Sequence, residues 1–265
     1  YKESGYDKDG FKILLQKHTN VRTNLFLQIA EEVYNYYQNS LKQKNAVDFA
    51  DMINDAERLL RTAEEKKIYL PYKYIIVDEF QDIARQRFNL TKTLANITGA
   101  KIVAVGDDWQ SIFAFAGADI TLFQKFLELM GHGVEMQIKH TYRNAQELID
   151  IAGGFIQKNP TQIKKQLISP KRIKDPVEIV EYDGTTSVLK NWTKAIDECV
   201  ERIVKEYGEK KSILLITRFN FEKDRLCESG YFSEGRGDFL IWKKNPNVSI
   251  TCLTAHSSKG LGFDN

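Results

Sequence analysis

The sequence predicts an α/β protein with parallel strands. In its first half, an apolar run at residues 74–78, a helical pattern at 84–98 and a second apolar run at 101–106 follow one another directly. The order strand, helix, strand is typical of a parallel sheet. A similar alternation fills the second half, so we expect two α/β lobes that join near residue 131, where GHG at 131–133 interrupts the pattern.

A helical segment is expected before the first lobe. Residues 1–20 are polar and irregular, but residues 1–70 as a whole are expected to be mainly helical. Apolar residues recur at helical spacing over 24–44 and again over 48–67, where Asp48 is a suitable N-cap. This segment leads directly into the first apolar strand.

The two expected lobes span residues 71–131 and 132–265. In the first, Gly99 should end the helix that begins at residue 84, because glycine readily adopts the left-handed conformation found after helices. A short helix is expected at 120–130. In the second lobe, the expected strands are 134–139, 177–182, 212–217 and 248–254, and the expected helices are 144–157, 187–207 and 220–229.

The composition allows a sizeable core. With 265 residues, of which 42% are hydrophobic, the chain can form one large domain or two ordinary ones, and this content argues against disorder. The net charge of +2 neither demands nor excludes nucleic acid, because such binding depends on local patches. No apolar run is long enough to span a membrane, so we expect no membrane association.

The cysteines indicate the cellular compartment, and the chain ends indicate a piece of a longer protein. Cys199, Cys227 and Cys252 are widely spaced and form no CxxC, so neither a disulfide framework nor a zinc site is expected. We expect them to be core residues in a reducing compartment, which indicates a cytoplasmic location. The chain begins with Tyr1 rather than Met, shows no signal peptide and stops after SSKGLGFDN, so we expect a piece of a longer protein.

Acidic residues end the first strand in YIIVDEFQD, residues 74–82. Asp78 and Glu79 stand at the carboxyl end of that strand, which is where parallel sheets bind ligands. An aspartate there can hold the magnesium ion of a bound ATP, and a neighbouring acid can orient the attacking water. The alternative is that the two acids only cap the next helix, where negative charge is favourable.

A second polar stretch, VGDDWQSIFAFAGAD at 105–119, also follows an apolar strand. Gly106 frees the backbone, and the Gln110 amide can donate to a phosphate and accept from a water. Phe113 and Phe115 alternate with small residues. They are either core residues or a platform on which bases stack.

The stretch HTYRNAQELIDIA at 140–152 places a cation and an aromatic ring before a helix. Arg143 offers bidentate recognition of phosphate, and the Tyr142 ring can stack on a flat partner. Alone this pattern is weak, because a tyrosine and an arginine often stand at a helix start.

An apolar strand also leads into the polar turn of TCLTAHSSKGLGFDN, residues 251–265. The turn carries His256, Ser257, Ser258 and Lys259. A glycine-containing turn of this kind allows backbone amides to approach a phosphate closely. A solvated loop is the alternative interpretation.

Taken together and in this order, these motifs resemble the UvrD/Rep group of superfamily 1 DNA helicases. DEFQD resembles the Walker B motif of the family, GDDWQSI the motif after it, and TYRNAQELIDIA and TAHSSKGL the motifs of the second lobe. The Trp109 variant is similar to the helicase IV branch. DFADM at 48–52 and RFNFEKDRL at 218–226 resemble further family segments, so the resemblance runs from about residue 45 to the C-terminus.

The resemblance implies two RecA-like lobes with parallel sheets of the P-loop NTPase type, the first incomplete and preceded by the helical segment. It also implies roles at the nucleotide. Asp78 would bind Mg²⁺, Glu79 would act as the catalytic base, and Gln110 would sense the γ-phosphate of ATP. Tyr142 would stack on the adenine, and Arg143 would contact the γ-phosphate.

The other residues assigned by the resemblance lie beside DNA or the nucleotide. The residues expected at single-stranded DNA are Phe115, Trp109, His256 and Ser257. Arg218 is expected to support the nucleotide cleft, and Lys259 and Gly260 are expected near the nucleotide or the DNA strand.

The sequence also departs from the family pattern. The phosphate-binding loop GxxxxGK[ST] has one near miss, from Gly5 to Gly10, but Phe11 stands where the lysine belongs. The last arginine motif of the family is absent as well. We therefore expect the carboxylates to hold the magnesium of an ATP whose main cradle lies on an N-terminal part outside this chain.

Individual substitutions add to these departures. Ala116 stands where many relatives carry arginine, which would weaken coupling between DNA and ATP. Gly262 stands where a glutamate usually contacts the ribose, and Phe113 replaces a common tyrosine. The interval from Arg218 to Thr254 is short, so the large insertion that many relatives carry there is expected to be absent.

The function implied by the resemblance is an ATP-dependent helicase that moves on single-stranded or partial duplex DNA, with roles such as DNA repair. The fragment is expected to be monomeric and inactive by itself. Two alternatives are the helicase module of an AddA/RecB-type nuclease–helicase and a degenerate, non-catalytic DNA-binding module. The basic stretch KNPTQIKKQLISPKRIK at 158–174 would either follow a DNA backbone or form a solvated loop.

Overall fold

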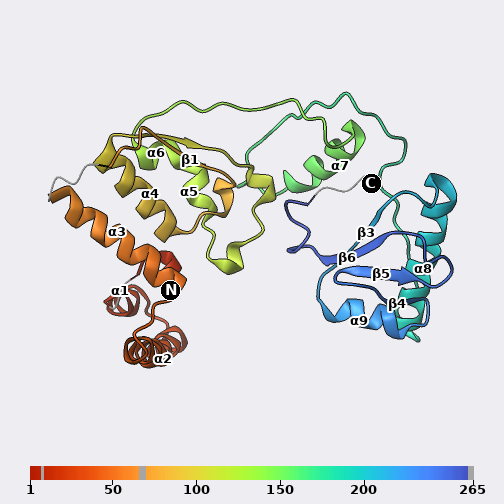
Figure 1. The fold of residues 1–265 in the computed structure, drawn as a ribbon, viewed down its shortest axis with the longest axis horizontal. Coiled ribbons are helices and arrows are strands. Elements are labelled where there is room, and N and C mark those ends of the chain that lie inside the picture. Colours follow the sequence, from red (N-terminus) through yellow and green to blue (C-terminus); the bar gives the residue numbers. More distant parts are fainter. Residues whose placement is uncertain (7–8, 66–69, 262–265) are drawn as a thin grey trace. The chain divides into compact units, whose positions relative to one another are not determined.

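The computed structural model of the chain describes residues 1–6, 9–65 and 70–261. They form two compact units, Tyr1–Ile173 and Lys174–Asn265 (Figure 1). The division lies later than the junction predicted near residue 131, because residues 132–173 pack with the first unit. Assignment of these residues to a second functional lobe therefore stays a prediction.

The first unit is mainly helical around one small sheet. Its helices are α1 (Gly10–Lys17), α2 (Val21–Gln43), α3 (Phe49–Glu65), α4 (Arg85–Thr98), α5 (Ile120–Gln124), α6 (Phe126–Met130) and α7 (Gln146–Ile156). Its strands are β1 (Tyr74–Val77) and β2 (Lys101–Ala104), and short 3₁₀ turns are η1 (Lys2–Ser4), η2 (Phe80–Asp82), η3 (Asp108–Gln110) and η4 (Ala114–Ala116). The helix expected at 120–130 is broken into two at Lys125.

Two predicted helix signals are confirmed by local geometry. The Asp51 backbone N–H donates to Asp48 Oδ1 at 2.8 Å, so Asp48 caps the start of α3. Gly99 follows α4 with φ of 65°, the left-handed conformation that a glycine adopts without steric cost. These caps satisfy backbone groups that have no partner inside the helix.

The N-terminal stretch is more ordered than its sequence predicted. The helix α1 was missed because its pattern is short. Phe11 is buried there, and its ring lies 4.0 Å from the Tyr1 ring, measured between centroids. Gly5 ends η1 and Gly10 begins α1, whereas residues 7 and 8 lie outside the described part. Phe11 therefore serves packing, in line with the rejection of this stretch as a phosphate-binding loop.

The amino terminus is tied to α3 by a nearly buried lysine. Lys2 Nζ lies 2.7 Å from Asp48 Oδ2 and 2.7 Å from Asp51 Oδ1. The Tyr37 hydroxyl also donates to Asp48 Oδ2, at 3.0 Å. Burial by itself would raise the pKa of Asp48, but the Lys2 ammonium and the donated hydrogen bonds together lower it. The side chain that caps α3 thus also fastens the chain terminus.

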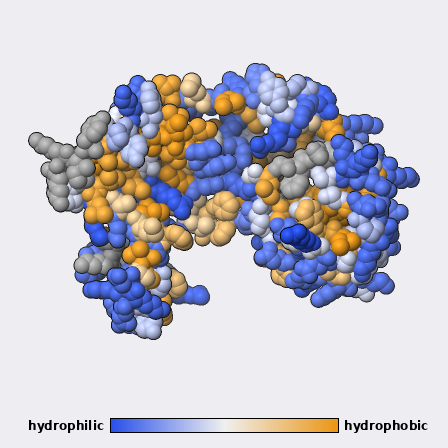
Figure 2. Space-filling view, viewed as in Figure 1, coloured by the Kyte–Doolittle hydropathy of each residue, from blue (hydrophilic) through white to orange (hydrophobic). Residues whose placement is uncertain are grey.

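The sheet of the first unit confirms the predicted parallel order. β1 and β2 pair in parallel, with Val77 opposite Ala104. One face packs on a cluster centred on Phe80, Phe88 and Leu122. The strands are buried on this face only, because the apolar side chains of the other face are exposed: Tyr74, Ile76, Val103 and Val105. In Figure 2, hydrophobic atoms gather where Figure 1 places β1 and α6.

The strand predicted at 134–139 is wrong for the described structure. Val134, Met136 and Ile138 alternate as a strand requires, but they are more than four-fifths exposed, at 85%, 86% and 83%. Only an isolated parallel bridge from His140 to Ile168 forms next to them. Alternation alone does not make a strand, because the backbone also needs a neighbour that accepts and donates its hydrogen bonds.

The second unit is an α/β layer with a mixed sheet. Its helices are α8 (Val188–Tyr207) and α9 (Phe221–Glu228), and its strands are β3 (Ile213–Thr217), β4 (Phe232–Glu234), β5 (Phe239–Trp242) and β6 (Ile250–Thr254). The strand order is β3-β6-β5-β4, with β3 and β6 parallel and the other pairs antiparallel. The predicted parallel pairing is thus confirmed for β3 and β6, whereas the antiparallel hairpin of β4 and β5 was missed because its strands are short.

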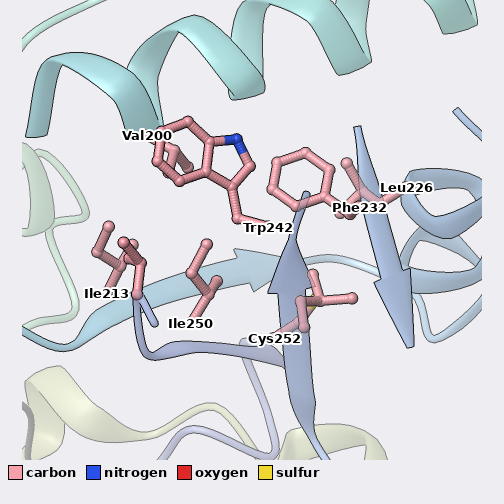
Figure 3. Close-up of a cluster of buried hydrophobic side chains, with 9 residues drawn as sticks. Val200, Ile213, Leu226, Phe232, Trp242, Ile250 and Cys252 are labelled. Atoms are coloured by element: carbon pink, nitrogen blue, oxygen red, sulfur yellow. The ribbon is translucent and has the colours of Figure 1, made fainter. Parts of the chain in front are cut away.

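The predicted strand at 177–182 is also not formed, and its apolar residues, such as Ile179 at 84%, remain exposed. The core of the unit lies instead between α8, α9 and the sheet (Figure 3). There the Trp242 Nε1–H donates to Asp197 Oδ1 at 2.8 Å, and Lys244 Nζ lies 2.8 Å from Asp197 Oδ2. No helix among the described residues is long and apolar enough to cross a membrane.

Replacing Trp242 by phenylalanine tests this core. Trp242 is 4% exposed and Asp197 2%, so the change removes buried volume and leaves one buried carboxylate oxygen without its donor. We expect the free energy of unfolding to fall by about 2–3 kcal/mol. Urea unfolding followed by circular dichroism measures it, with the exposed Tyr207→Phe on α8 as the control. Equal free energies of unfolding for the two variants would contradict the stabilising role of the contact between Trp242 and Asp197.

Candidate functional site

The parallel pairing of β1 and β2 brings two polar stretches to one edge of the sheet. The Val105 N–H donates to the Val77 carbonyl at 2.9 Å, and the Phe80 N–H donates back to the Val105 carbonyl at 2.9 Å. Asp78 and Glu79 thus stand beside the turn that follows β2. This is the carboxyl edge of the strands, where ligands bind in open α/β sheets.

Glu79 has an unusual backbone for a residue with a side chain. Its φ of 49° and ψ of 42° lie in the left-handed region. This conformation costs of order 1–3 kcal/mol and persists only where the surroundings impose it. The Glu79 N–H donates to Asp78 Oδ1 at 2.8 Å, and the side chain of Glu79 does not cap η2. The interpretation of these acids as helix caps is therefore not supported.

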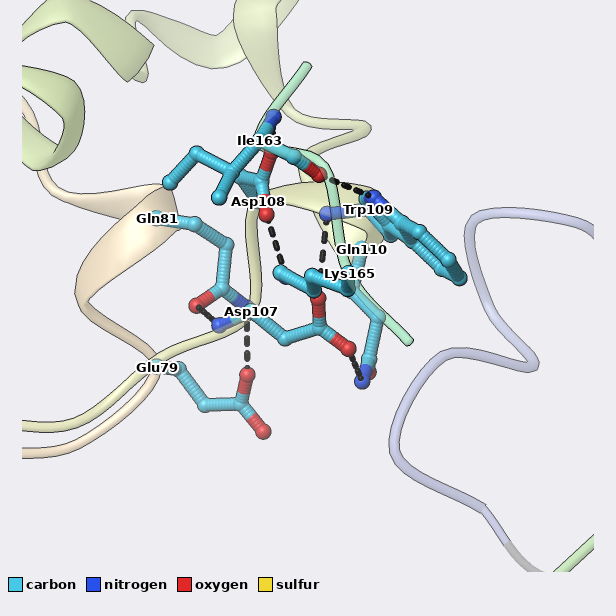
Figure 4. Close-up of polar contacts among 8 residues, drawn as sticks. All are labelled: Glu79, Gln81, Asp107, Asp108, Trp109, Gln110, Ile163 and Lys165. Carbon is cyan, nitrogen blue, oxygen red and sulfur yellow. Dashed lines mark hydrogen bonds and ion pairs between the residues drawn. The ribbon is translucent and has the colours of Figure 1, made fainter. Parts of the chain in front are cut away.

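The buried side chain of Gln81 joins Glu79 to the second polar stretch (Figure 4). Gln81 is 0% exposed, and its Nε2 donates to Glu79 Oε2 at 2.6 Å. Its Oε1 accepts from the Asp107 N–H at 3.0 Å. Asp107 Oδ2 in turn accepts from Gln110 Nε2 at 2.8 Å. We call Glu79, Gln81, Asp107 and Gln110 the carboxylate–amide chain.

Sequence reasoning did not include Gln81 among the site residues. The available signal was a polar amide directly after a buried strand, in FQD. Gly106 supports the same contact, because a Cβ atom at this position would lie only 2.5 Å from Gln81 Oε1. A side chain there would displace the Gln81 amide, so this close approach requires glycine.

Asp107 remains ionised within this chain. Burial by itself would raise its pKa, but the Lys165 ammonium and the Gln110 amide lower it below the ordinary value of an aspartate. Lys165 Nζ lies 2.5 Å from Asp107 Oδ1. Asp107 is therefore held as a hydrogen-bond acceptor for the Gln110 amide.

The carboxylates at this edge offer only some of the oxygen ligands that a magnesium ion needs. Asp78 is exposed and offers a hard carboxylate oxygen, which suits Mg²⁺. Within the described ranges, no group of three or more His, Cys, Asp or Glu side chains forms a metal cage. One carboxylate beside substrate phosphates is a usual Mg²⁺ arrangement, and a protein-only cage is not. The donor set thus fits Mg²⁺ bound together with a nucleotide.

Trp109 packs inside the first unit. Its Nε1–H donates to the Ile163 carbonyl at 3.1 Å, and Lys165 Nζ lies 5.4 Å from the centre of its ring. Helix α7 also approaches the indole, since a Cβ atom on Gly153 would lie 3.0 Å from Trp109 Cη2. The role of Trp109 at DNA, which the resemblance implied, stays a prediction.

Tyr142 and Arg143 lie on an exposed turn before α7, and the Tyr142 side chain is 71% exposed. Two hydrogen bonds from side chains of residues 169–171 hold the backbone of this turn. Lys171 Nζ donates to the Arg143 carbonyl at 3.1 Å, and the buried Ser169 Oγ donates to the Asn144 carbonyl at 2.6 Å. Both side chains are thus presented from a turn with a fixed backbone.

Phe115 lies on an exposed loop next to the carboxylate–amide chain. It is 73% exposed, so its interpretation as a core residue is wrong. The Phe113 ring lies 6.0 Å from it, measured between centroids. The loop is fastened by Asp119, which accepts from Arg85 Nη2 at 2.6 Å. An exposed ring on a fastened loop suits stacking on a base.

The second unit gathers the remaining predicted residues at one sheet edge. β3 and β6 pair with Thr217 opposite Thr254, and the Ala255 N–H donates to the Thr217 carbonyl at 3.0 Å. This contact brings Arg218 beside the turn that follows β6. That turn carries the residues predicted to meet DNA or nucleotide: His256, Ser257, Lys259 and Gly260. Gly262 lies outside the described residues.

The turn after β6 is closed by its own side chains. Thr254 Oγ1 accepts from the Ser257 N–H at 3.2 Å and lies 2.9 Å from Ser257 Oγ. Gly260 has φ of 80°. His256 is exposed, and the Arg218 guanidinium lies 5.4 Å from the Phe219 ring. The edge therefore presents a histidine, an arginine and a tight turn to solvent.

Comparison with known proteins identifies relatives of this chain. Residues 4–130 match the family model described as UvrD/REP helicase N-terminal domain. DNA helicase IV of Escherichia coli K12 is 31% identical over 229 residues, which cover 86% of this chain and 30% of that protein. A probable DNA helicase II homolog of Mycoplasma capricolum is 29% identical over 199 residues, covering 72% of this chain and 27% of that protein.

A third relative is the ATP-dependent DNA helicase PcrA of Staphylococcus epidermidis. It is 30% identical over 188 residues, which cover 69% of this chain and 25% of that protein. The chain thus spans between a quarter and a third of the length of these relatives.

The substitution Gly106→Ala tests the contact between the two sheet ends. The added methyl group would meet Gln81 Oε1 and would lie 3.1 Å from the Phe80 backbone nitrogen, which cannot easily move. We expect the free energy of unfolding to fall by about 1–3 kcal/mol, as measured by urea unfolding. The control is Gly154→Ala in α7, where nothing lies within 4 Å of the new atom. That change should be neutral or stabilising, and equal losses in both variants would contradict the assignment.

Proposed function

We propose that this chain, which matches the UvrD/REP helicase N-terminal domain over residues 4–130 and is similar to DNA helicase IV over 86% of its length, is part of an ATP-dependent DNA helicase. In this proposal the enzyme couples hydrolysis of Mg·ATP to movement along single-stranded DNA. The observation that carries the proposal is the carboxylate–amide chain, which links a predicted catalytic base to a predicted phosphate sensor through a buried amide.

The hydrolytic step assigns one task to each residue of this edge. Asp78 would hold Mg²⁺ together with the phosphates of ATP. Bound Mg²⁺ neutralises the charge that develops on the transferred phosphoryl group. Glu79 would orient the attacking water and accept its proton, as a general base must lie within hydrogen-bond reach of that proton. Gln110 would report the presence of the γ-phosphate through Asp107 and Gln81 back to Glu79.

Two further residues of the first unit would complete the nucleotide contacts. Tyr142 would stack on the adenine, and Arg143 would pair with the γ-phosphate, which its planar, permanently charged guanidinium suits. Their support is the exposed turn on which they lie, whose backbone is fixed by Lys171 and Ser169. Arg218 would support the binding of the nucleotide, and Lys259 and Gly260 would lie near the nucleotide or the DNA strand.

The DNA strand would contact aromatic and polar side chains. Phe115 would stack on a base, and its exposure supports this role. Trp109, His256 and Ser257 are the other residues proposed at the strand. The proposed architecture is two RecA-like lobes, residues 71–131 and 132–265, whose relative movement follows ATP binding and hydrolysis. A cytoplasmic location is part of this proposal.

The change Glu79→Gln in the full-length protein tests this function. Loss of the base should lower the DNA-stimulated ATPase rate by about 10²-fold or more, because general base catalysis contributes about 10²–10⁴-fold. Steady-state ATPase assays with and without single-stranded DNA measure it, and the exposed Lys12→Met on α1 is the control. Wild-type protein that binds DNA without ATP turnover would overturn the proposal and favour the degenerate module.

The 265-residue chain by itself should show no robust ATPase activity, with or without single-stranded DNA. Its sequence holds no GxxxxGK[ST] loop, whose backbone amides and lysine bind the triphosphate. The same assay as above measures this, with the Glu79→Gln chain as the background control. Turnover that exceeds this background and disappears on removal of Mg²⁺ would contradict the prediction.

A further inference from the structure

Residues 161–171, which we call the strap, join two turns that the proposed function places at the nucleotide. At its start, the Ile163 N–H donates to Asp108 Oδ2 at 2.7 Å, next to Gln110. At its end, the Ser169 N–H donates to Gln146 Oε1 at 2.7 Å, next to the turn of Arg143. The strap thus connects the turn of the predicted phosphate sensor to the turn of the predicted phosphate-binding arginine.

Lys165 is the charged anchor of the strap (Figure 4). Its ammonium lies between the carboxylates of Asp107 and Asp108 and pairs with both. The side chain of Asp108 is 0% exposed and that of Lys165 only 18%. The neighbouring Trp109 indole packs under the same ammonium and donates to the strap backbone. The pair between Lys165 and Asp108 is therefore buried, whereas the Asp107 side chain is 34% exposed.

These contacts leave Lys165 engaged inside the first unit. Lys171 and Arg172 of the same basic stretch also donate to backbone carbonyl groups, those of Arg143 and Ser169. A lysine that is enclosed by two carboxylates does not reach a DNA phosphate. The interpretation of the whole basic stretch as a DNA track is therefore not supported at Lys165.

The position of Lys165 has a chemical consequence for Gln110. Without the ammonium, the adjacent carboxylates of Asp107 and Asp108 would repel each other, and the buried one would lack a counter-charge. The Asp107 side chain accepts from the Gln110 amide, and the Asp107 backbone N–H donates to the Gln81 side chain. A shift of Asp107 would therefore move both ends of the carboxylate–amide chain.

We propose that Lys165 is a positioning residue for ATP hydrolysis: it holds Asp107, and through it Gln110 and Glu79, in the hydrolytic arrangement. It also ties that arrangement to the Arg143 turn through the strap. This inference rests on the proposed helicase function and adds a residue that does not itself touch the nucleotide. The chemistry at the phosphate remains that of Glu79, Gln110 and Arg143.

The test uses the full-length protein and four variants. Lys165→Met removes the charge at similar length, and Lys165→Arg keeps the charge. The matched control is Lys164→Met, which makes the same change at the exposed neighbouring position. In the double variant Asp108→Asn/Lys165→Met, a neutral amide replaces the buried carboxylate, so no counter-charge is needed at position 108. For each protein, kcat and KM for ATP at saturating single-stranded DNA and the thermal midpoint are measured.

We expect Lys165→Met to lower kcat about tenfold or more, with KM within about twofold of wild type, since an interaction that only orients the reacting groups acts on kcat. Lys165→Arg should recover most of kcat, and Lys164→Met should match wild type. The double variant should recover the thermal midpoint but not kcat. Recovery of both would show that Lys165 only compensates a buried charge, and would overturn the proposal, as would an unchanged kcat in Lys165→Met.

A second readout separates this inference from the proposed function. The indole N–H resonance of Trp109, assigned with Trp109→Phe, reports the bond to Ile163 without any ATP turnover. It should shift in Lys165→Met and stay in place in Lys164→Met. Absence of ATPase activity in the wild-type protein would refute the proposed function, whereas an unmoved resonance in Lys165→Met would refute the anchoring role of Lys165 even in an active enzyme.

Discussion

The candidate site depends on a buried side-chain amide, that of Gln81. Its nitrogen donates to Glu79 and its oxygen accepts from the Asp107 backbone, so it joins the ends of β1 and β2. A buried amide that loses these partners would cost about 1–3 kcal/mol. The hydrogen bonds that satisfy Gln81 therefore also set the position of the predicted base relative to the turn that carries Gln110.

The surroundings of Gln81 show how this contact is maintained. Phe80 next to it is 1% exposed and packs among aromatic rings of α4, α5 and α6, which fixes the backbone just after Glu79. This packing explains how Glu79 keeps a left-handed backbone. Gly106 leaves the space that the amide occupies. The hydrophobic cluster below the sheet thus stabilises a strained polar turn at its edge.

Local sequence signals predicted most helices and the parallel pairs, but not every strand. Asp48 and Gly99 marked helix ends correctly, because capping depends on neighbouring backbone groups. The run at 134–139 alternates apolar and polar residues, and the run at 177–182 is rich in β-branched residues, but neither forms a strand in the described structure. A strand requires a partner from elsewhere in the chain, and the residues of one strand do not specify that partner.

The sequence by itself determined which chemical groups stand at the strand ends: Asp78, Glu79 and Gln110 after β1 and β2, and Arg218 and His256 after β3 and β6. Parallel pairing then brings each set to one edge, which is why the order of motifs was informative. Only the tertiary structure decided that Gln81 links Glu79 to Asp107 and that Lys165 lies between Asp107 and Asp108. The physical reason is that buried polar groups must find partners, and these partners are distant in the sequence.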